Sequence, residues 1–308
     1  MPRLAKLSKK QKITFLADLE HGYRPFDKHA LKLLQSLLDD GDAEVRAEAI
    51  ACLWLDPDPR WIDMLIKKVD DDIHADVRAH AISALGRYVY EGEIAVEDGW
   101  ESPEVSIQTD DYTRVCDFLF RIAQDVDEPL ETRRYAIEAL AFRTDDAEVL
   151  DLIEWAYQHK DRRLKVSAIF AMARNGDPRF YKAILSELHS GDPEIQHEAI
   201  HAAGEMGIPE AARALTELIR DKSLRKSLRL LSIYALGQTG HESAYAVLDQ
   251  LTHSRDRDVR QVAQDAIEEW LLVNSEQMEM DRADLGDDFA SDDFPDIWND
   301  EFGTFSRN

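Results

Sequence analysis

The chain has 308 residues, of which 44% are hydrophobic and 32% are charged, which is enough apolar material for a core beneath a well-solvated surface. Its 37 lysines and arginines stand against 62 aspartates and glutamates, and a formal charge of -25 argues against general binding to nucleic acid or to anionic membranes, because both would be repelled. Two cysteines exclude a disulfide framework and a cysteine-rich zinc site, and the lack of a long apolar run predicts a soluble, cytoplasmic protein.

The first predicted element is an amphipathic helix over residues 8–20, within an N-terminal segment that spans residues 1–26. Every charged residue before Asp18 is basic. Two roles fit this segment. It is either a cap that covers the open end of a helical array, or a basic docking helix for a partner or for the protein's own acidic tail.

Residues 27–273 contain a recurring pattern. An aliphatic residue and a basic residue precede two variable positions, a small residue and Ile, and Ala-Leu-Gly or a variant follows. The small anchor residues are Ala49, Ala81, Ala136, Ala168, Ala199, Ser232 and Ala263. Five of the six spacings between these anchors are 31 to 33 residues, and the sixth is 55 because it holds an insert. Self-similarity at such a period is typical of repeat architectures.

Each copy of the pattern follows a second stretch with apolar residues three and four apart, which predicts a helix before the anchor helix. The Asp58-Pro59 and Asp177-Pro178 pairs are typical of helix starts. Glycines are predicted at or just beyond helix ends, where a left-handed backbone is easiest for this residue. These glycines are Gly86, Gly176, Gly207 and Gly240. The repeating unit is therefore helix, turn, helix.

Copies such as DAEVRAEAIA from Asp42 and ADVRAHAISALG from Ala75 resemble the HEAT-repeat family, in particular the short bacterial type called phycobilisome-lyase HEAT-like repeats. The resemblance implies an all-α, right-handed α-solenoid of about seven helical-hairpin repeats over residues 27–273. Such arrays bury each repeat against its neighbours and present a long concave surface.

One row of the repeat is basic, and we expect it to form a structural ladder that bridges to acidic turn residues of adjacent repeats, such as Asp42 or Asp76. Ligand contact is the alternative. The row consists of Arg46, Arg78, Arg133, Lys165, Arg229 and Arg260, with Gln196 as the exception.

Two segments depart from the repeat. The insert at about residues 90–112 has eight acidic residues and no lysine or arginine, and it is expected to be a long loop, either solvated or partner-binding. The acidic-aromatic tail, residues 274–308, is predicted to be disordered when free. Its rings are Phe289, Phe294, Trp298, Phe302 and Phe305. Three roles remain open for the tail, namely solubility, recognition of a partner, or binding to the protein's own groove.

Catalytic motifs are lacking, and no catalytic residue, metal or cofactor is expected. His197, His201 and Glu205 share a helix face. The weak candidates for a metal site are His197, Glu198 and His201. The His197-Glu198 pair resembles the His-Glu pairs of deoxyhypusine hydroxylases, which bind a di-iron centre, but the equivalent positions of the other repeats lack that pair.

The prediction for function is a non-enzymatic scaffold or adaptor that binds a protein partner on the concave face, with the tail as a second contact. The candidate concave residues are His80, Arg87, Arg134, Glu138, Phe170, Arg174, His197, His201, Glu205, Tyr234 and Gln238. The alternative is a phycobilin lyase-like protein that binds and transfers a tetrapyrrole, held by Arg134, Phe170, Arg174 and Tyr234. A metal-dependent hydroxylase is a more remote alternative. Partner, pathway and oligomeric state stay open.

Overall fold

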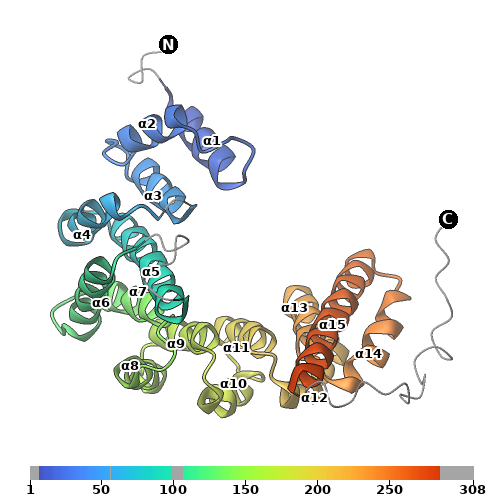
Figure 1. Cartoon of the computed structure of the whole chain (residues 1–308). Coiled ribbons are helices and arrows are strands. Elements are labelled where there is room, and N and C mark those ends of the chain that lie inside the picture. The colour runs from blue at the N-terminus through green and yellow to red at the C-terminus, as the bar shows by residue number, and fades with distance from the viewer. Residues whose placement is uncertain (1–6, 56, 99–106, 285–308) are drawn as a thin grey trace.

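The computed structural model describes residues 7–55, 57–98 and 107–284 (Figure 1). In these residues the chain forms fifteen α-helices, several short 3-10 segments and no strand. None of the described helices is both long enough and apolar enough to cross a lipid bilayer. The predicted all-α solenoid is confirmed.

Seven helical hairpins follow one another, and each consists of an outer helix and then an inner helix. The outer helices are α2 (Lys28–Leu37), α4 (Ile62–Asp71), α6 (Thr109–Gln124), α8 (Ala147–Gln158), α10 (Tyr181–Glu187), α12 (Ala212–Arg220) and α14 (Glu242–Thr252). The inner helices are α3 (Ala43–Ala51), α5 (Ala75–Asp98), α7 (Leu130–Leu140), α9 (Arg162–Asn175), α11 (Pro193–Glu205), α13 (Lys226–Gln238) and α15 (Arg257–Asp284). The 3-10 segments are η2 (Cys52–Leu55), η3 (Pro59–Trp61), η4 (Pro178–Phe180) and η5 (Pro209–Ala211).

The inner helices form one continuous stack, in which each packs closely on the next from α3 to α15, whereas neighbouring outer helices touch far less. A stack that is tight on one side and loose on the other must curve. Figure 1 shows the resulting arc, with α6, α8 and α10 along its outer edge and α5, α9 and α11 along its inner edge. The inner helices therefore line the concave side.

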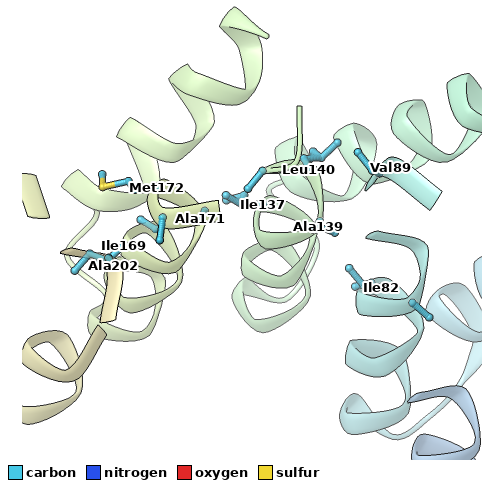
Figure 2. Close-up of a cluster of buried hydrophobic side chains, with 14 of the residues drawn as sticks. Ile82, Val89, Ile137, Ala139, Leu140, Ile169, Ala171, Met172 and Ala202 are labelled. Carbon is cyan, nitrogen blue, oxygen red and sulfur yellow. The ribbon is translucent and has the colours of Figure 1, made fainter. Parts of the chain in front are cut away.

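The close approach of neighbouring inner helices depends on residues at three equivalent positions of each repeat. Two of these positions hold small residues, and the third holds isoleucine in most repeats. The anchor residues and the second small row, which runs from Cys52 to Ala266, are buried throughout the array. Figure 2 shows this packing in the middle of the molecule, where Ile82, Ile137 and Ile169 come from α5, α7 and α9. Each isoleucine is almost fully buried, which contributes about 1.5–3 kcal/mol relative to an exposed side chain.

The predicted helix starts and most of the predicted helix ends are confirmed. Asp58 and Asp177 accept hydrogen bonds from backbone N–H groups, and the prolines that follow them occupy the first turn of η3 and η4. Three of the four glycines have the left-handed backbone that ends a helix, namely Gly176, Gly207 and Gly240. The prediction is wrong for Gly86, because α5 continues to Asp98 and Gly86 packs against Ala139 of α7.

The basic row does form a structural ladder, and it uses two kinds of partner. As predicted, it bridges to acidic residues of the next repeat, because Arg46 pairs with Asp72 at 2.9 Å and Lys165 with Glu187 at 2.6 Å. It also bonds to backbone carbonyls. Arg46 donates to the carbonyl of Asp40 at 2.8 Å, Arg78 to that of Asp72 at 2.9 Å and Arg260 to that of Ser254 at 2.8 Å. Gln196 does the same with the carbonyl of Leu188 at 2.9 Å. These side chains cap the free carbonyls near the end of the outer helix in their own hairpin. Asp42 and Asp76 are not their partners.

Helix α1 (Lys9–Glu20) covers the free side of the first inner helix. It begins at a capping box formed by Ser8 and Gln11, and it buries apolar side chains against α3 and η2. Lys9 pairs with Asp42 and Glu44 at the start of α3, at 2.9 and 2.6 Å. Lys12 likewise pairs with Asp40, so these two lysines are used within the molecule.

The two segments that depart from the repeat are more helical than expected. In the range predicted as a long loop, residues 90–98 extend α5 and residues 109–112 begin α6, so the prediction is wrong for both parts. At the C-terminus, α15 continues to Asp284, so residues 274–284 are helical rather than disordered. The five tail aromatics lie outside the described residues.

Candidate functional site

The concave face presents two rows of side chains that repeat with the anchor residues. Positions two and six after each anchor are four residues apart, so they share a helix face. The first row includes Ser83, Glu138, Phe170, His201 and Tyr234. The second row includes Arg87, Phe142, Arg174, Glu205 and Gln238. All of these residues are partly or fully exposed, whereas the anchors are buried. Most of the predicted binding residues therefore do line one surface.

Within these rows lies a connected group of rings and guanidinium groups that we call the aromatic–arginine strip. It consists of Trp54, Arg87, Tyr90, Phe142, Phe170 and Arg174. The guanidinium of Arg87 lies 5.7 Å from the ring centroid of Trp54 and 4.9 Å from that of Tyr90. Tyr90 in turn meets Phe142 edge-on, with ring centroids 5.3 Å apart. Both geometries are attractive for rings and cations.

Arg174 continues the strip from repeat three into repeat four. Its guanidinium lies 4.4 Å from the ring centroids of both Phe142 and Phe170, and it donates to the backbone carbonyl of Glu138 at 3.3 Å. The strip therefore spans four successive repeats, from η2 to α9. Its rings are held by side-chain contacts and remain partly open to solvent.

Three carboxyl groups, which we call the acidic cluster, lie next to the strip: Glu138 on α7 with Glu198 and Glu205 on α11. Burial raises the pKa of Glu138 above its usual range, although Ser167, Arg134 and Arg174 act in the opposite direction. Burial, with the charges of Glu138 and Glu205, raises the pKa of Glu198 to about 7. A cationic group brought to this cluster would be attracted and would favour ionisation of Glu198.

The predicted histidines lie beside the acidic cluster. Nδ1 of His201 is 3.4 Å from Oε2 of Glu205 and 3.9 Å from Oε1 of Glu198, while burial and then His201 lower the pKa of His197. As for a metal, no group of three or more His, Cys, Asp or Glu side chains suited to hold an ion occurs in the described part of the chain. The weak candidates all lie on one helix, α11.

The side chains of Arg134 and His80 make hydrogen bonds within the protein. The Arg134 guanidinium pairs with Glu131 at 2.5 Å and donates to Ser167 at 3.0 Å and to Tyr135 at 2.8 Å. Nδ1 of His80 lies 2.7 Å from the carbonyl oxygen of Asp76, one turn earlier in α5. Arg134 is therefore a structural residue in this arrangement, rather than a free cation that faces a ligand.

Tyr234 and Gln238 extend the two rows onto α13. The Tyr234 side chain is 37% exposed. Gln238 packs over Gly204 of α11, so closely that a Cβ at Gly204 would meet its side-chain oxygen. The concave face therefore continues past the acidic cluster into repeat six.

Sequence reasoning missed three members of the strip, and one of them was detectable. Phe142 lies six residues after its anchor, the register that Arg87 and Arg174 also occupy. Trp54 was missed because α3 gives way to the 3-10 segment η2, which changes the helical register. Tyr90 was missed because α5 was expected to end near Gly86.

A family model described as HEAT repeats matches residues 30–97 and 181–268, which together make up just over half of the chain. Deoxyhypusine hydroxylase from Drosophila pseudoobscura pseudoobscura is 27% identical over 105 residues, which are 33% of this chain and 35% of that protein. The chain thus spans about a third of the length of this curated relative.

Solved structures share the architecture at low sequence identity. Yeast importin-beta (Kap95p) is 14% identical with a TM-score of 0.51, and the match covers 86% of this chain and 39% of that one. The complex of CpcE and CpcF of phycocyanin lyase from Nostoc sp. PCC7120 is 17% identical with a TM-score of 0.48, over 86% of this chain and 95% of that one. The importin-beta match shows the solenoid fold.

Proposed function

The chain belongs to the HEAT-repeat family, and on that premise we propose that it is a non-enzymatic scaffold or adaptor that binds a protein partner along its concave face. The inner helices supply the contact surface, and the tail, residues 274–308, supplies a second contact. Two-point attachment of this kind raises the overall affinity through effective concentration, without requiring either contact to be strong.

The observation that carries the proposal is the aromatic–arginine strip. Rings and arginines are the residue types that dominate binding energy at protein interfaces, and in this chain they are linked across four repeats. Neighbouring side chains already hold the rings in place, so little conformational entropy is lost when a partner packs against them. The strip is a preorganised contact surface.

The position of the acidic cluster relative to the strip predicts the order of residue types in the bound segment of the partner. A segment that lies along the arc from repeat one to repeat five meets rings first and carboxyl groups next. The complementary ligand is therefore an extended protein segment with apolar or aromatic residues, followed by a lysine or arginine that lies against Glu198 and its neighbours. Binding of that basic residue would release the proton that Glu198 holds near neutral pH.

Site-specific photo-crosslinking in the native cell tests this function. A benzophenone amino acid replaces Tyr234 on the concave face or, as the matched control, Trp155 on the outer helix α8. Both side chains are 37% exposed, so accessibility does not distinguish them. We expect a discrete protein adduct from position 234 and none from position 155. Replacing Phe142 and Arg174 by alanine should lower the yield of that adduct more than about tenfold.

Adducts of equal yield from positions 155 and 234 would show that partners do not prefer the concave face. An adduct at position 234 that survives the loss of Phe142 and Arg174 would remove the strip from the interface. Circular dichroism of the double variant controls for misfolding, because both side chains are partly buried.

A further inference from the structure

Five cationic side chains gather on one edge of repeats six and seven, and we call this group the basic edge patch. It consists of Arg220, Lys222, Arg225, Arg255 and Arg257, all of them exposed. Among the described residues, none of these side chains has an ion-pair or hydrogen-bond partner. With Lys226, the two turns carry six cations against three acids, Asp221, Asp256 and Asp258, so this edge is a local excess of positive charge in a chain with a formal charge of -25.

The two turns that carry the patch are held together by the protein itself. Nζ of Lys226 lies 2.8 Å from Asp256 and 2.7 Å from Asp258, which bridges the turn of repeat six to that of repeat seven. Asp221, in the turn of repeat six, accepts hydrogen bonds from the backbone and side chain of Ser223 at 2.8 and 2.6 Å. These three acids contact Lys226 or Ser223 and none of the five cations, so the five cations can pair with a further anion.

The C-terminal segment of the same chain has the complementary charge. Residues 285–308 contain seven acidic residues and one basic residue, together with all five tail aromatics. The segment follows directly on α15, whose first residue, Arg257, belongs to the patch. Because the segment is tethered to the array, its effective concentration at the patch is on the order of millimolar, which a free acidic protein rarely reaches.

Residues 285–308 are long enough to run back along α15 and reach the basic edge patch. From Asp284 back to Arg257 the helix rises about 40 Å, which about 12 residues of extended chain cover. Asp296, Asp300 and Glu301 would then arrive at the patch. Halfway along, Leu271 and Leu272 are 53% and 52% exposed, and at about 3.3 Å per residue Phe289 reaches the level of Leu272. Rings and carboxylates thus meet apolar and cationic groups in matching order.

We propose that residues 285–308 dock in cis on the basic edge patch, running antiparallel to α15 with their rings over Leu271 and Leu272. This contact holds the acidic-aromatic tail on the free protein and covers part of α15. The inference is independent of the concave-face function. A partner that binds the tail must first displace it from the patch.

Distances between spin labels test this contact in the full chain. Labels are placed at Asn299→Cys in the tail and at Gln250→Cys, an exposed position near the end of α14 and five residues before Arg255. Cys52 and Cys116 are buried, and burial raises the pKa of their thiols to about 12 and about 11, so the introduced cysteines react first. Electron–electron dipolar spectroscopy should give one narrow, short distance population. That population should be lost in the triple variant Arg220→Glu, Arg225→Glu, Arg255→Glu and in high salt, because both weaken the attraction between the tail and the patch.

The matched control reverses three exposed lysines elsewhere, as Lys67→Glu, Lys160→Glu and Lys182→Glu, and should leave the narrow population intact. A broad distribution in the unmodified chain would overturn the proposal, as would a narrow one that ignores both charge reversal and salt. A narrow distance between Asn299→Cys and a label at Ser83→Cys would instead place the tail on the concave face. A signal between singly labelled chains would assign the contact to a second copy.

Discussion

Glu198 is the residue in which the environment changes the chemistry most. Its side chain is only 15% exposed, and Glu138 and Glu205 add their charges to the effect of burial. Folding therefore raises the pKa of this carboxyl from 4.5 to about 7. Between these two pH values the folded chain keeps a proton that the unfolded chain releases.

This shift predicts how stability depends on pH. The stabilising effect of the bound proton is fully present below the unfolded pKa and is lost as the pH rises through about 7. Glu198→Gln removes the titration. The free energy of unfolding of Glu198→Gln, minus that of the unmodified chain, should therefore rise by about 2 kcal/mol between about pH 5.5 and about pH 8. Urea unfolding followed by circular dichroism measures it.

Glu210→Gln is the control, because it removes one negative charge from an exposed position of repeat six. Its stability relative to the unmodified chain should change little over the same range. An equal response from the two variants would attribute the effect to net charge rather than to the acidic cluster.

At the scale of helices, the inner stack depends on positions without room for a side chain. Gly237 of α13 faces α15, and a Cβ placed on it would lie 2.2 Å from the carbonyl oxygen of Ala266 and 2.9 Å from its carbonyl carbon. Those atoms are backbone, so they cannot swing away as a flexible side chain can. The two helices approach closely because this position is glycine.

Gly237→Ala should therefore push α15 away from α13. We expect a loss of about 1–3 kcal/mol in the free energy of unfolding, the usual cost of forcing a methyl group into a packed interior. The matched control is Gly191→Ala in the turn before α11, where nothing lies within 4 Å of the added atom. Thermal unfolding of the two variants measures the difference. Equal melting temperatures would mean that the interface between α13 and α15 accommodates the added methyl group without loss of stability.

At the scale of the whole molecule, the buried core runs along the entire array and does not form one compact centre. Each inner helix packs on the one before and the one after, and α1 packs on α3 and η2 at the N-terminal end. Stability in such a chain is close to a sum of local terms and neighbour terms. A change at one end should therefore weaken that end first.

Leu16→Ala tests this locality. Leu16 is buried between α1 and the first repeat, and the truncation costs about 2–5 kcal/mol. Hydrogen exchange measured by mass spectrometry should rise strongly in α1, α2 and α3 and change little in α11 and α13. The mirror control, Leu215→Ala in α12, should raise exchange in repeats five to seven instead. A uniform rise over the whole array in either variant would show that the molecule unfolds as one unit.

The repeat pattern predicted the fold well because the same physical demand recurs about every 32 residues. Wherever inner helices meet, the anchor residue must be small and the isoleucine must be buried, and both conditions are met. The concave rows could be predicted in part for the same reason. The register of Arg87 and Arg174 also identified the position of Phe142, whereas Trp54 and Tyr90 required helix ends that sequence patterns place poorly.

What the sequence determined by itself is periodic: helix pairs, buried rows, capping aspartates and an acidic balance, each set by residues close together in the chain. What only the tertiary structure decided is which side chains from different repeats meet. Arg174 contacts two rings, Glu198 is close enough to Glu138 and Glu205 for their charges to act on it, and five cations of repeats six and seven share one edge. Those contacts depend on the spacing and curvature of the inner stack, which arise from close packing across repeats rather than from any local pattern.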